Sequence, residues 1–251
     1  MAERIDDLQI NGYRLIQNPA LFCFGCDAVL LSSYAKAKEG LRIMDLGCGN
    51  GVIPILLSAK TKAKEIVGLE IQEESVSLAR RSVELNGLTD RVKIVQGDIK
   101  EAANIFGNSS FDVVTTNPPY MNSGCGLTND ASAMTIARHE VLVSLEDIIS
   151  QSARLLRPGG NFFMIHRPHR LTDIMALMRE YKIEPKRMRM VHPYADKEPT
   201  MVLIEGNRGG RPNLIVEPPL VIYKDVNEYT EEVFRIYGYD RNTVSGCDTD
   251  R

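Results

Sequence analysis

Short apolar runs alternate with amphipathic stretches from residue 41 onward, and this alternation predicts the order of the elements. The expected strands lie at 41–47, 65–70, 91–98, 111–117, 161–167, 187–192 and 200–205. The expected helices lie at about 51–61, 72–87, 144–160 and 170–181. The third of these helices has Ser144 as its N-cap and ends at Pro158-Gly159-Gly160. Strands alternating with helices predict an α/β fold, a mostly parallel sheet with helices on both faces.

The segments on either side of this core have a different character. A helix is expected within 24–37, N-capped near Asp27, and residues 240–251 have the polar composition of a disordered tail. The sequence therefore suggests four parts. They are an N-terminal extension (1–40) with a helix that covers a cofactor, a catalytic domain (41–223), a C-terminal helix (224–239) and the tail (240–251).

The composition is that of a globular protein and excludes several classes. Of 251 residues, 43% are hydrophobic and 25% charged, and no run reaches the roughly 18 apolar residues of a membrane span. The N-terminus lacks the apolar region of a signal peptide, so we expect a cytoplasmic protein. Five cysteines are too few and odd in number for a disulfide framework. The pair Cys23 and Cys26 has redox or zinc spacing but no second pair, and the histidines are not clustered, so no metal is expected.

The charge is unevenly distributed along the chain. The net charge is −3, yet residues 154–211 contain 12 Lys or Arg against 6 Asp or Glu. Such a segment is either a phosphate-binding face or a set of solvated helix faces. The sequence leaves both interpretations open, and it leaves the oligomeric state open between a monomer and a weak dimer.

The stretch "DLGCGNG" (45–51) follows a strand and opens a helix. Gly47, Gly49 and Gly51 allow a tight turn and the close approach of a ligand. The third glycine comes one residue earlier than in a dinucleotide-binding loop, and Asp45 would repel a pyrophosphate. The loop therefore suits a ligand that carries an amine or a cation.

Two more acids end the next two strands. Glu70 is placed to accept hydrogen bonds from both hydroxyls of a ribose, and Asp98 is placed to accept one from an adenine amine. Each acid alone could simply cap the following helix. Together with Asp45, they describe a site for S-adenosylmethionine.

These residues resemble the class I S-adenosylmethionine-dependent methyltransferases, and the resemblance spans about 41–205, including "LLRPGG" (155–160). It implies a Rossmann-like, seven-stranded sheet whose last strand is antiparallel. It also implies that the glycine loop lies under the methionine portion of the cofactor. The implied cofactor-binding residues are Asp27, Asp45, Gly47, Cys48, Gly49, Gly51, Glu70, Ile71, Asp98, Ile99 and Asn117.

The strand at 111–117 ends in Asn117-Pro118-Pro119-Tyr120, the acceptor motif of methyltransferases that act on a planar, conjugated nitrogen. Such a nitrogen is a poor nucleophile because its lone pair is delocalised. The Asn117 side-chain oxygen and the Pro118 carbonyl can each accept one N–H hydrogen bond and turn the lone pair toward the methyl donor. The prolines stiffen the backbone, and Tyr120 can stack on a flipped base.

Further stretches resemble the bacterial tRNA(Val) adenine-N6 methyltransferases over residues 5–223. They are "FGCDAVLLSSYA" (24–35), "ARHE" (137–140), "RPHRL" (167–171) and "EPPLVIY" (217–223). The resemblance implies a tRNA substrate, a role for Asp27 in shaping the cofactor pocket, and N6-methyladenosine as the product. The residues expected around the acceptor mouth are Tyr120, Arg138, His139, Arg167, His169 and Arg170, although Arg138 could instead pair with Glu140. Lys186, Arg187 and Arg189 are weaker candidates for RNA contact.

Other acceptors share the motif. Protein-glutamine methyltransferases that modify release factors usually carry a helical domain before the core, for which about 40 residues leave no room. Guanine-N2 methyltransferases are a further alternative. A cofactor-binding module without catalysis is disfavoured by the intact motif, and a nicotinamide dehydrogenase by the loop spacing.

Overall fold

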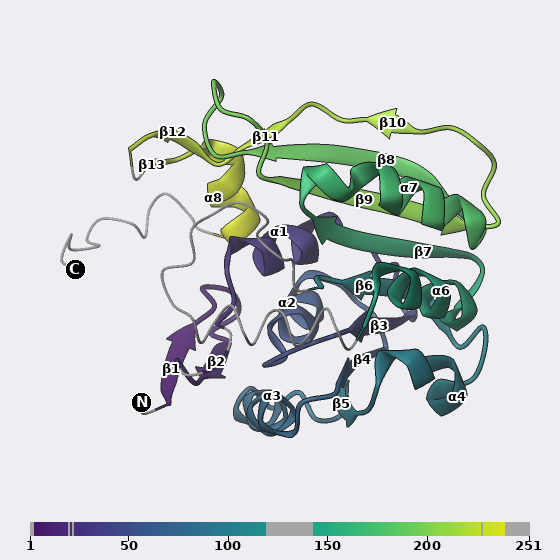
Figure 1. Ribbon diagram of the computed structural model, residues 1–251. Helices are drawn as coiled ribbons and strands as arrows, with labels where there is room; N and C mark the ends of the chain where they lie inside the picture. The colour runs from purple at the N-terminus through teal and green to yellow at the C-terminus, as the bar shows by residue number, and fades with distance from the viewer. Residues whose placement is uncertain (1–2, 20, 22, 119–142, 227, 239–251) are drawn as a thin grey trace.

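The computed structural model describes residues 3–19, 21, 23–118, 143–226 and 228–238. A twisted central sheet has helices on both faces (Figure 1). Its main strands are β3 (Arg42–Leu46), β4 (Glu65–Glu70), β5 (Val92–Gln96), β6 (Phe111–Thr116), β7 (Leu156–His166), β8 (Ile183–His192) and β9 (Met201–Arg208). Two further strands, β10 (Ile215–Val216) and β11 (Leu220–Val221), both pair with β8.

The order of the main strands is β5-β4-β3-β6-β7-β9-β8. Strands β5 to β7 pair in parallel, whereas β9 is antiparallel to both β7 and β8. The Rossmann-like α/β fold, with an antiparallel seventh strand, is confirmed. Within the described residues the sheet has nine strands rather than seven, because β10 and β11 extend its β8 edge.

The helices divide the apolar core into two layers. One layer joins the sheet to α1 (Cys26–Tyr34), α2 (Val52–Lys60), α3 (Glu73–Leu85) and α8 (Glu231–Tyr237). The other joins it to α4 (Ala102–Phe106), α6 (Leu145–Leu155) and α7 (Leu171–Glu180). Alternate strand residues feed alternate layers: in β3, Ile43 belongs to the first and Met44 to the second.

Small hairpins and turns complete the chain. Strands β1 (Arg4–Asp7) and β2 (Arg14–Gln17) pair with each other, as do β12 (Tyr223–Asp225) and β13 (Glu228–Tyr229). The 3₁₀ turns are Ile99–Glu101 and Pro168–Arg170. Among the described residues, no helix combines the length and apolar character that a membrane crossing requires.

The expected end of helix α6 is wrong. Ser144 caps the helix as predicted, in a reciprocal capping box with Asp147, but the helix ends at Leu155 and "LRPGG" already belongs to β7. Leu156 pairs with Phe111 and Asn161 with Val113, so Arg157 to Gly160 bulge out of the ladder. Gly159 has a φ of +79°, which a glycine adopts without the steric cost that other residues bear.

The expected N-cap of α1 is also wrong. Gly25 occupies that position, and Asp27 lies within the first turn. The Asp27 carboxylate accepts a hydrogen bond from the Ala28 N–H at 2.9 Å. An acidic residue in the first turn is favourable because it faces the positive end of the helix dipole.

Candidate functional site

The glycine loop between β3 and α2 folds back onto the neighbouring strand. The backbone N–H groups of Gly47 and Cys48 both donate to the Leu69 carbonyl, at 2.9 and 3.0 Å. The Cys48 side chain is buried against Gly68, where an added Cβ would lie 2.7 Å from the Cys48 sulfur. The loop is therefore supported from below by β4, and Gly68 leaves the space that Cys48 fills.

The three loop glycines all have positive φ but differ in their surroundings. The φ angles are 73° at Gly47, 52° at Gly49 and 84° at Gly51. A Cβ at Gly51 would lie 3.0 Å from the Ala79 methyl group of α3, whereas a Cβ at Gly49 would meet nothing within 4 Å. The backbone at Gly49 is thus open to a ligand, and the backbone at Gly51 is packed against a helix.

Asp45 lies beneath this loop with no exposed surface. The Thr115 hydroxyl donates to Asp45 Oδ1 at 2.6 Å, while Oδ2 is buried without a hydrogen-bond partner among the described residues. Burial raises the pKa of Asp45 to about 8, the nearby Glu70 adds to this rise, and the Thr115 hydrogen bond opposes it. The carboxyl group therefore supports the loop from within the sheet.

Glu70, the last residue of β4, connects two turns. One carboxylate oxygen accepts from the Gly49 N–H and the other from the Gln72 N–H, each at 2.9 Å. A carboxylate has about four acceptor positions, so these bonds leave capacity for hydroxyl donors of a ligand. Next to it, Ile71 is an exposed apolar side chain, 39% accessible.

The turn after β5 meets the glycine loop from the other side. A Cβ at Gly47 would lie 3.7 Å from Ile99 Cδ1. Asp98 accepts a hydrogen bond from the Lys100 N–H at 2.9 Å and caps the 3₁₀ turn that begins at Ile99. The capping role considered for Asp98 is present, and its second carboxylate oxygen remains available for the predicted contact with adenine.

Two buried residues that the sequence did not single out connect the N-terminal segment to the loop. Gln17 and Asn50 are 2% and 8% exposed. The Gln17 side-chain oxygen accepts from the Phe24 N–H at 3.1 Å and from the Asn50 amide at 3.4 Å. The segment that leads into α1 therefore lies against the glycine loop. Only their burial reveals these residues, because an Asn or Gln carries no distinctive spacing.

The acceptor motif begins directly after β6. The Thr115 and Thr116 hydroxyls both contact β3, and Thr116 donates to the Leu46 carbonyl at 3.0 Å. These bonds fix Asn117, which is half-buried, and Pro118, which is buried, next to the start of the glycine loop. Pro119, Tyr120, Arg138 and His139 lie outside the described residues.

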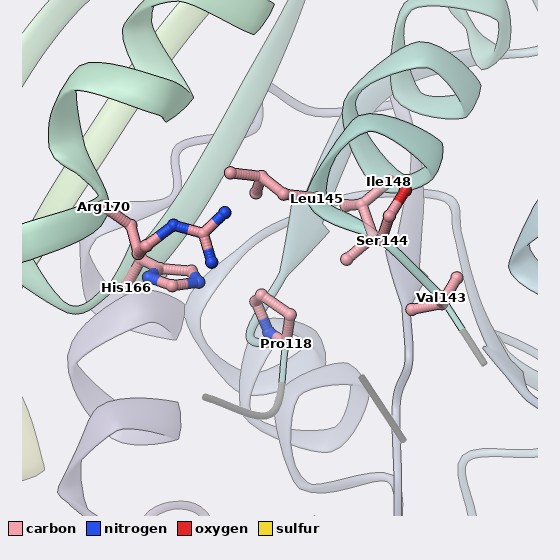
Figure 2. Close-up of a pocket in the computed structure, with 7 residues that line it drawn as sticks. All are labelled: Pro118, Val143, Ser144, Leu145, Ile148, His166 and Arg170. Atoms are coloured by element: carbon pink, nitrogen blue, oxygen red, sulfur yellow. The ribbon is translucent and has the colours of Figure 1, made fainter. Parts of the chain in front are cut away.

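A pocket of about 190 Å³ opens beside Pro118. Figure 2 shows Pro118 facing the side chains of His166 and Arg170 across it, with the start of α6 as the other wall. The lining residues are Pro118, Val143, Ser144, Leu145, Ile148, His166 and Arg170. His166 is the last residue of β7 and was not among the predicted site residues, although it directly precedes "RPHRL".

The predicted basic residues after β7 have different environments. Arg170 lines the pocket and pairs with Asp173 at 2.8 Å, His169 is exposed, and Arg167 donates to the Thr200 carbonyl at 3.0 Å. The structure thus brings Arg170 to the acceptor pocket and directs one Arg167 nitrogen to the loop before β9.

The rest of the basic segment does not form one continuous face. Arg187 is bonded to Glu205 and to Glu217, and its guanidinium lies over the Tyr34 ring at 4.5 Å. Arg189 pairs with Glu232 at 2.7 Å. These pairs join β8 to the C-terminal segment, and they favour a structural role over contact with a phosphate.

The pair Cys23 and Cys26 has no metal environment. Both thiols are free, and the part of the chain with described coordinates contains no group of three metal-ligating side chains.

Comparison with known proteins agrees with this arrangement. A family model described as a methyltransferase domain matches residues 37–202. The chain belongs to the methyltransferase domain family. A tRNA1(Val) (adenine(37)-N6)-methyltransferase of Porphyromonas gingivalis is 30% identical over 187 residues, which cover 72% of each chain. The protein of the same name from Tolumonas auensis is 24% identical over 229 residues, 88% of this methyltransferase and 90% of that one.

Solved structures show the same fold. A predicted O-methyltransferase of Agrobacterium tumefaciens superposes with a TM-score of 0.69 at 24% identity, covering 84% of this methyltransferase and 95% of that chain. The 16S rRNA N2 G1207 methyltransferase of T. thermophilus, solved with AdoMet and guanosine, has a TM-score of 0.60 at 21% identity. That match covers 83% of this chain and 51% of the other.

Proposed function

We propose that this methyltransferase transfers a methyl group from S-adenosylmethionine to N6 of an adenine in tRNA, in the anticodon loop of a valine tRNA. The observation that supports this most is the position of Asn117 and Pro118. They follow β6, beside the strand that leads into the glycine loop. The names of the relatives supply the acceptor.

The residues around the glycine loop fit S-adenosylmethionine. The open backbone at Gly49 suits the methionine portion, and Glu70, with remaining acceptor capacity, suits the ribose hydroxyls. Ile71 and Ile99 offer apolar contact on the side where Asp98 would accept from the adenine amine. The segment from Gln17 to α1 lies against the loop, which agrees with a covering role for residues 1–40 and for Asp27.

The bound cofactor supplies an electrophilic methyl group on a sulfonium. The Asn117 side-chain oxygen and the Pro118 carbonyl accept the two N–H hydrogens of the amine and hold its lone pair toward that methyl group. The new N–C bond forms as the S–C bond breaks, and the electron pair of the broken bond stays on sulfur. The two oxygens stabilise the positive charge that develops on nitrogen. The methylated nitrogen then loses a proton to water.

An acceptor assay tests this function. The full chain is incubated with tritiated-methyl S-adenosylmethionine and, in separate reactions, with unmodified valine tRNA and with a release factor. We expect label in the tRNA, recovered as N6-methyladenosine after digestion to nucleosides. Label only in the protein would contradict the proposal in favour of a glutamine acceptor, and N2-methylguanosine would contradict it in favour of guanine.

We also propose that the protein works in the cytoplasm, where tRNA is found, and as a monomer or weak dimer. All the described site residues come from one chain, so the site needs no partner subunit for these elements. Light scattering over a concentration series would test this, and a stable higher oligomer would contradict it.

A further inference from the structure

The side chain of His166 is a buried polar group in the wall of the acceptor pocket. It ends β7 and is only 4% exposed, yet it lines the same pocket as Pro118. In Figure 2 the imidazole lies below the Arg170 side chain and extends toward the Pro118 ring. A buried polar side chain beside the proposed position of the reacting base calls for a chemical role.

The hydrogen bond at Nδ1 determines which ring nitrogen carries the proton. His166 Nδ1 accepts from the Arg167 N–H at 2.8 Å, so this nitrogen has no hydrogen of its own. Burial lowers the pKa of His166 to about 4, and the nearby positive charges of Arg170, His169 and Arg167 lower it further. At neutral pH the ring is therefore uncharged, and its proton is on Nε2, which makes Nε2 a hydrogen-bond donor.

The pattern of groups on adenine complements this donor. The N6 amine offers two hydrogens, which Asn117 and Pro118 would accept, and a ring nitrogen with a lone pair lies on each side of it: N1 on one side and N7 on the other. Building on the proposed function, we propose that His166 Nε2–H donates a hydrogen bond to one of these ring nitrogens and thereby positions adenine for transfer at N6.

This contact makes His166 a specificity-determining residue. Two acceptors flanked by one donor match the edge of adenine, whereas guanine has a carbonyl in place of the amine at C6 and a hydrogen on N1. A site built to hydrogen-bond a substrate rejects an analogue that leaves its polar groups unpaired. The imidazole would therefore help to exclude guanine from the pocket.

A cycle that varies both the protein and the base tests the contact. Anticodon stem-loop RNAs carry adenosine, 1-deazaadenosine or 7-deazaadenosine at the methylated position, and kcat/KM is measured for wild type and for His166→Phe. We expect wild type to lose about tenfold on one of the two deaza bases, the size of one hydrogen bond to a neutral group. His166→Phe should show no such preference, and comparing ratios cancels the intrinsic reactivity of each base.

Two conservative variants distinguish base contact from local structure. His166→Asn places its oxygen near Nδ1 and keeps the bond to the Arg167 N–H, whereas His166→Gln reaches the position of Nε2 with an amide donor. A base contact predicts that Gln restores the preference for adenosine and Asn does not. Rescue by Asn alone, or equal rates of wild type on all three bases, would overturn the proposal. Failure of the proposed function is distinguishable, because wild type would then form no N6-methyladenosine even with unmodified RNA.

Discussion

The carboxyl group of Asp45 shows how burial of one residue sets a measurable property of the whole protein. In the unfolded chain this group has the ordinary pKa of 3.8, whereas in the folded protein burial raises the pKa to about 8. Between these values the folded protein retains a proton that the unfolded chain has lost. The free energy of unfolding therefore falls as the pH rises from about 4 to about 8.

Replacing Asp45 by Asn removes this titration and keeps an oxygen for the Thr115 hydrogen bond. We expect Asp45→Asn to be more stable than wild type, by a margin that grows from pH 5 to pH 8 and then levels off. Urea unfolding of both proteins across that range measures the margin. Thr115→Val, which removes the hydrogen bond that lowers this pKa, should reduce the stability of the wild-type chain, and in the Asp45→Asn variant its effect should not depend on pH. A margin that does not change with pH would contradict this account.

Sequence reasoning found the residues whose signal is local. Glu70 ends a strand where the apolar run stops, and Ser144 caps a helix where the helical spacing starts. It did not find His166, because a lone histidine at the end of a strand carries no spacing signal. Nor could the sequence show that Asp45 lies under the loop with no exposed surface, since burial depends on packing between distant elements.

At the scale of elements, the glycine loop has one glycine that serves the ligand and one that serves the packing. Gly49 and Gly51 share a positive φ, so alanine at either position should cost about 1–2 kcal/mol of stability. Only at Gly51 does the added methyl group collide with α3, through Ala79, which typically costs a further ~1–3 kcal/mol.

These two substitutions form a matched pair. We expect Gly51→Ala to lower the melting temperature more than Gly49→Ala, and Gly49→Ala to weaken S-adenosylmethionine binding more relative to its loss of stability. Thermal unfolding and calorimetric titration of the two variants separate the effects. If Gly49→Ala bound the cofactor as tightly as wild type, the methionine portion would not lie on this part of the loop.

The order of elements was largely predictable because the periods of strand and helix alternate clearly. The boundary between α6 and β7 was not, since Pro158-Gly159-Gly160 is typical of a helix end and of a strand bulge alike. The register that resolves this choice comes from β6, where the Asp112 carboxylate pairs with Arg157, 45 residues away, and the Asp112 carbonyl would lie 2.9 Å from a Cβ at Gly160. The two short strands β10 and β11 were missed for a similar reason, because a two-residue strand has no period.

At the scale of the molecule, Lys60 connects the two ends of the chain. At the end of α2, its ammonium donates to the Ser33 hydroxyl at 2.6 Å and to the Val29 carbonyl at 3.4 Å in α1, and to the Ile236 carbonyl at 3.1 Å in α8. Figure 1 shows α8 lying over α1. Burial lowers the pKa of Lys60 from 10.5 to about 8.

This pKa gives a prediction with a definite sign. Between about pH 8 and 10.5 the unfolded chain holds a proton on Lys60 that the folded protein has released, so the free energy of unfolding of the wild type rises with pH. Relative to Lys60→Met, which has no such group, wild type should gain stability across this interval and show a constant difference below it. Urea unfolding from about pH 7 to pH 10.5 measures the difference, and a constant difference throughout would show that the ammonium is not desolvated.

The sequence resemblance and the matches to relatives agree over most of the chain, and the central claim concerns its activity on tRNA. Nucleoside mass spectrometry of valine tRNA from a strain that lacks this gene tests that claim most directly. The account predicts that N6-methyladenosine disappears and returns with the wild-type gene. With Asn117→Ala it should not return, because losing one of two preorganised polar contacts to the reacting group lowers kcat by about 10²–10³. Unchanged N6-methyladenosine in the deletion strain, or full restoration by Asn117→Ala, would contradict the account.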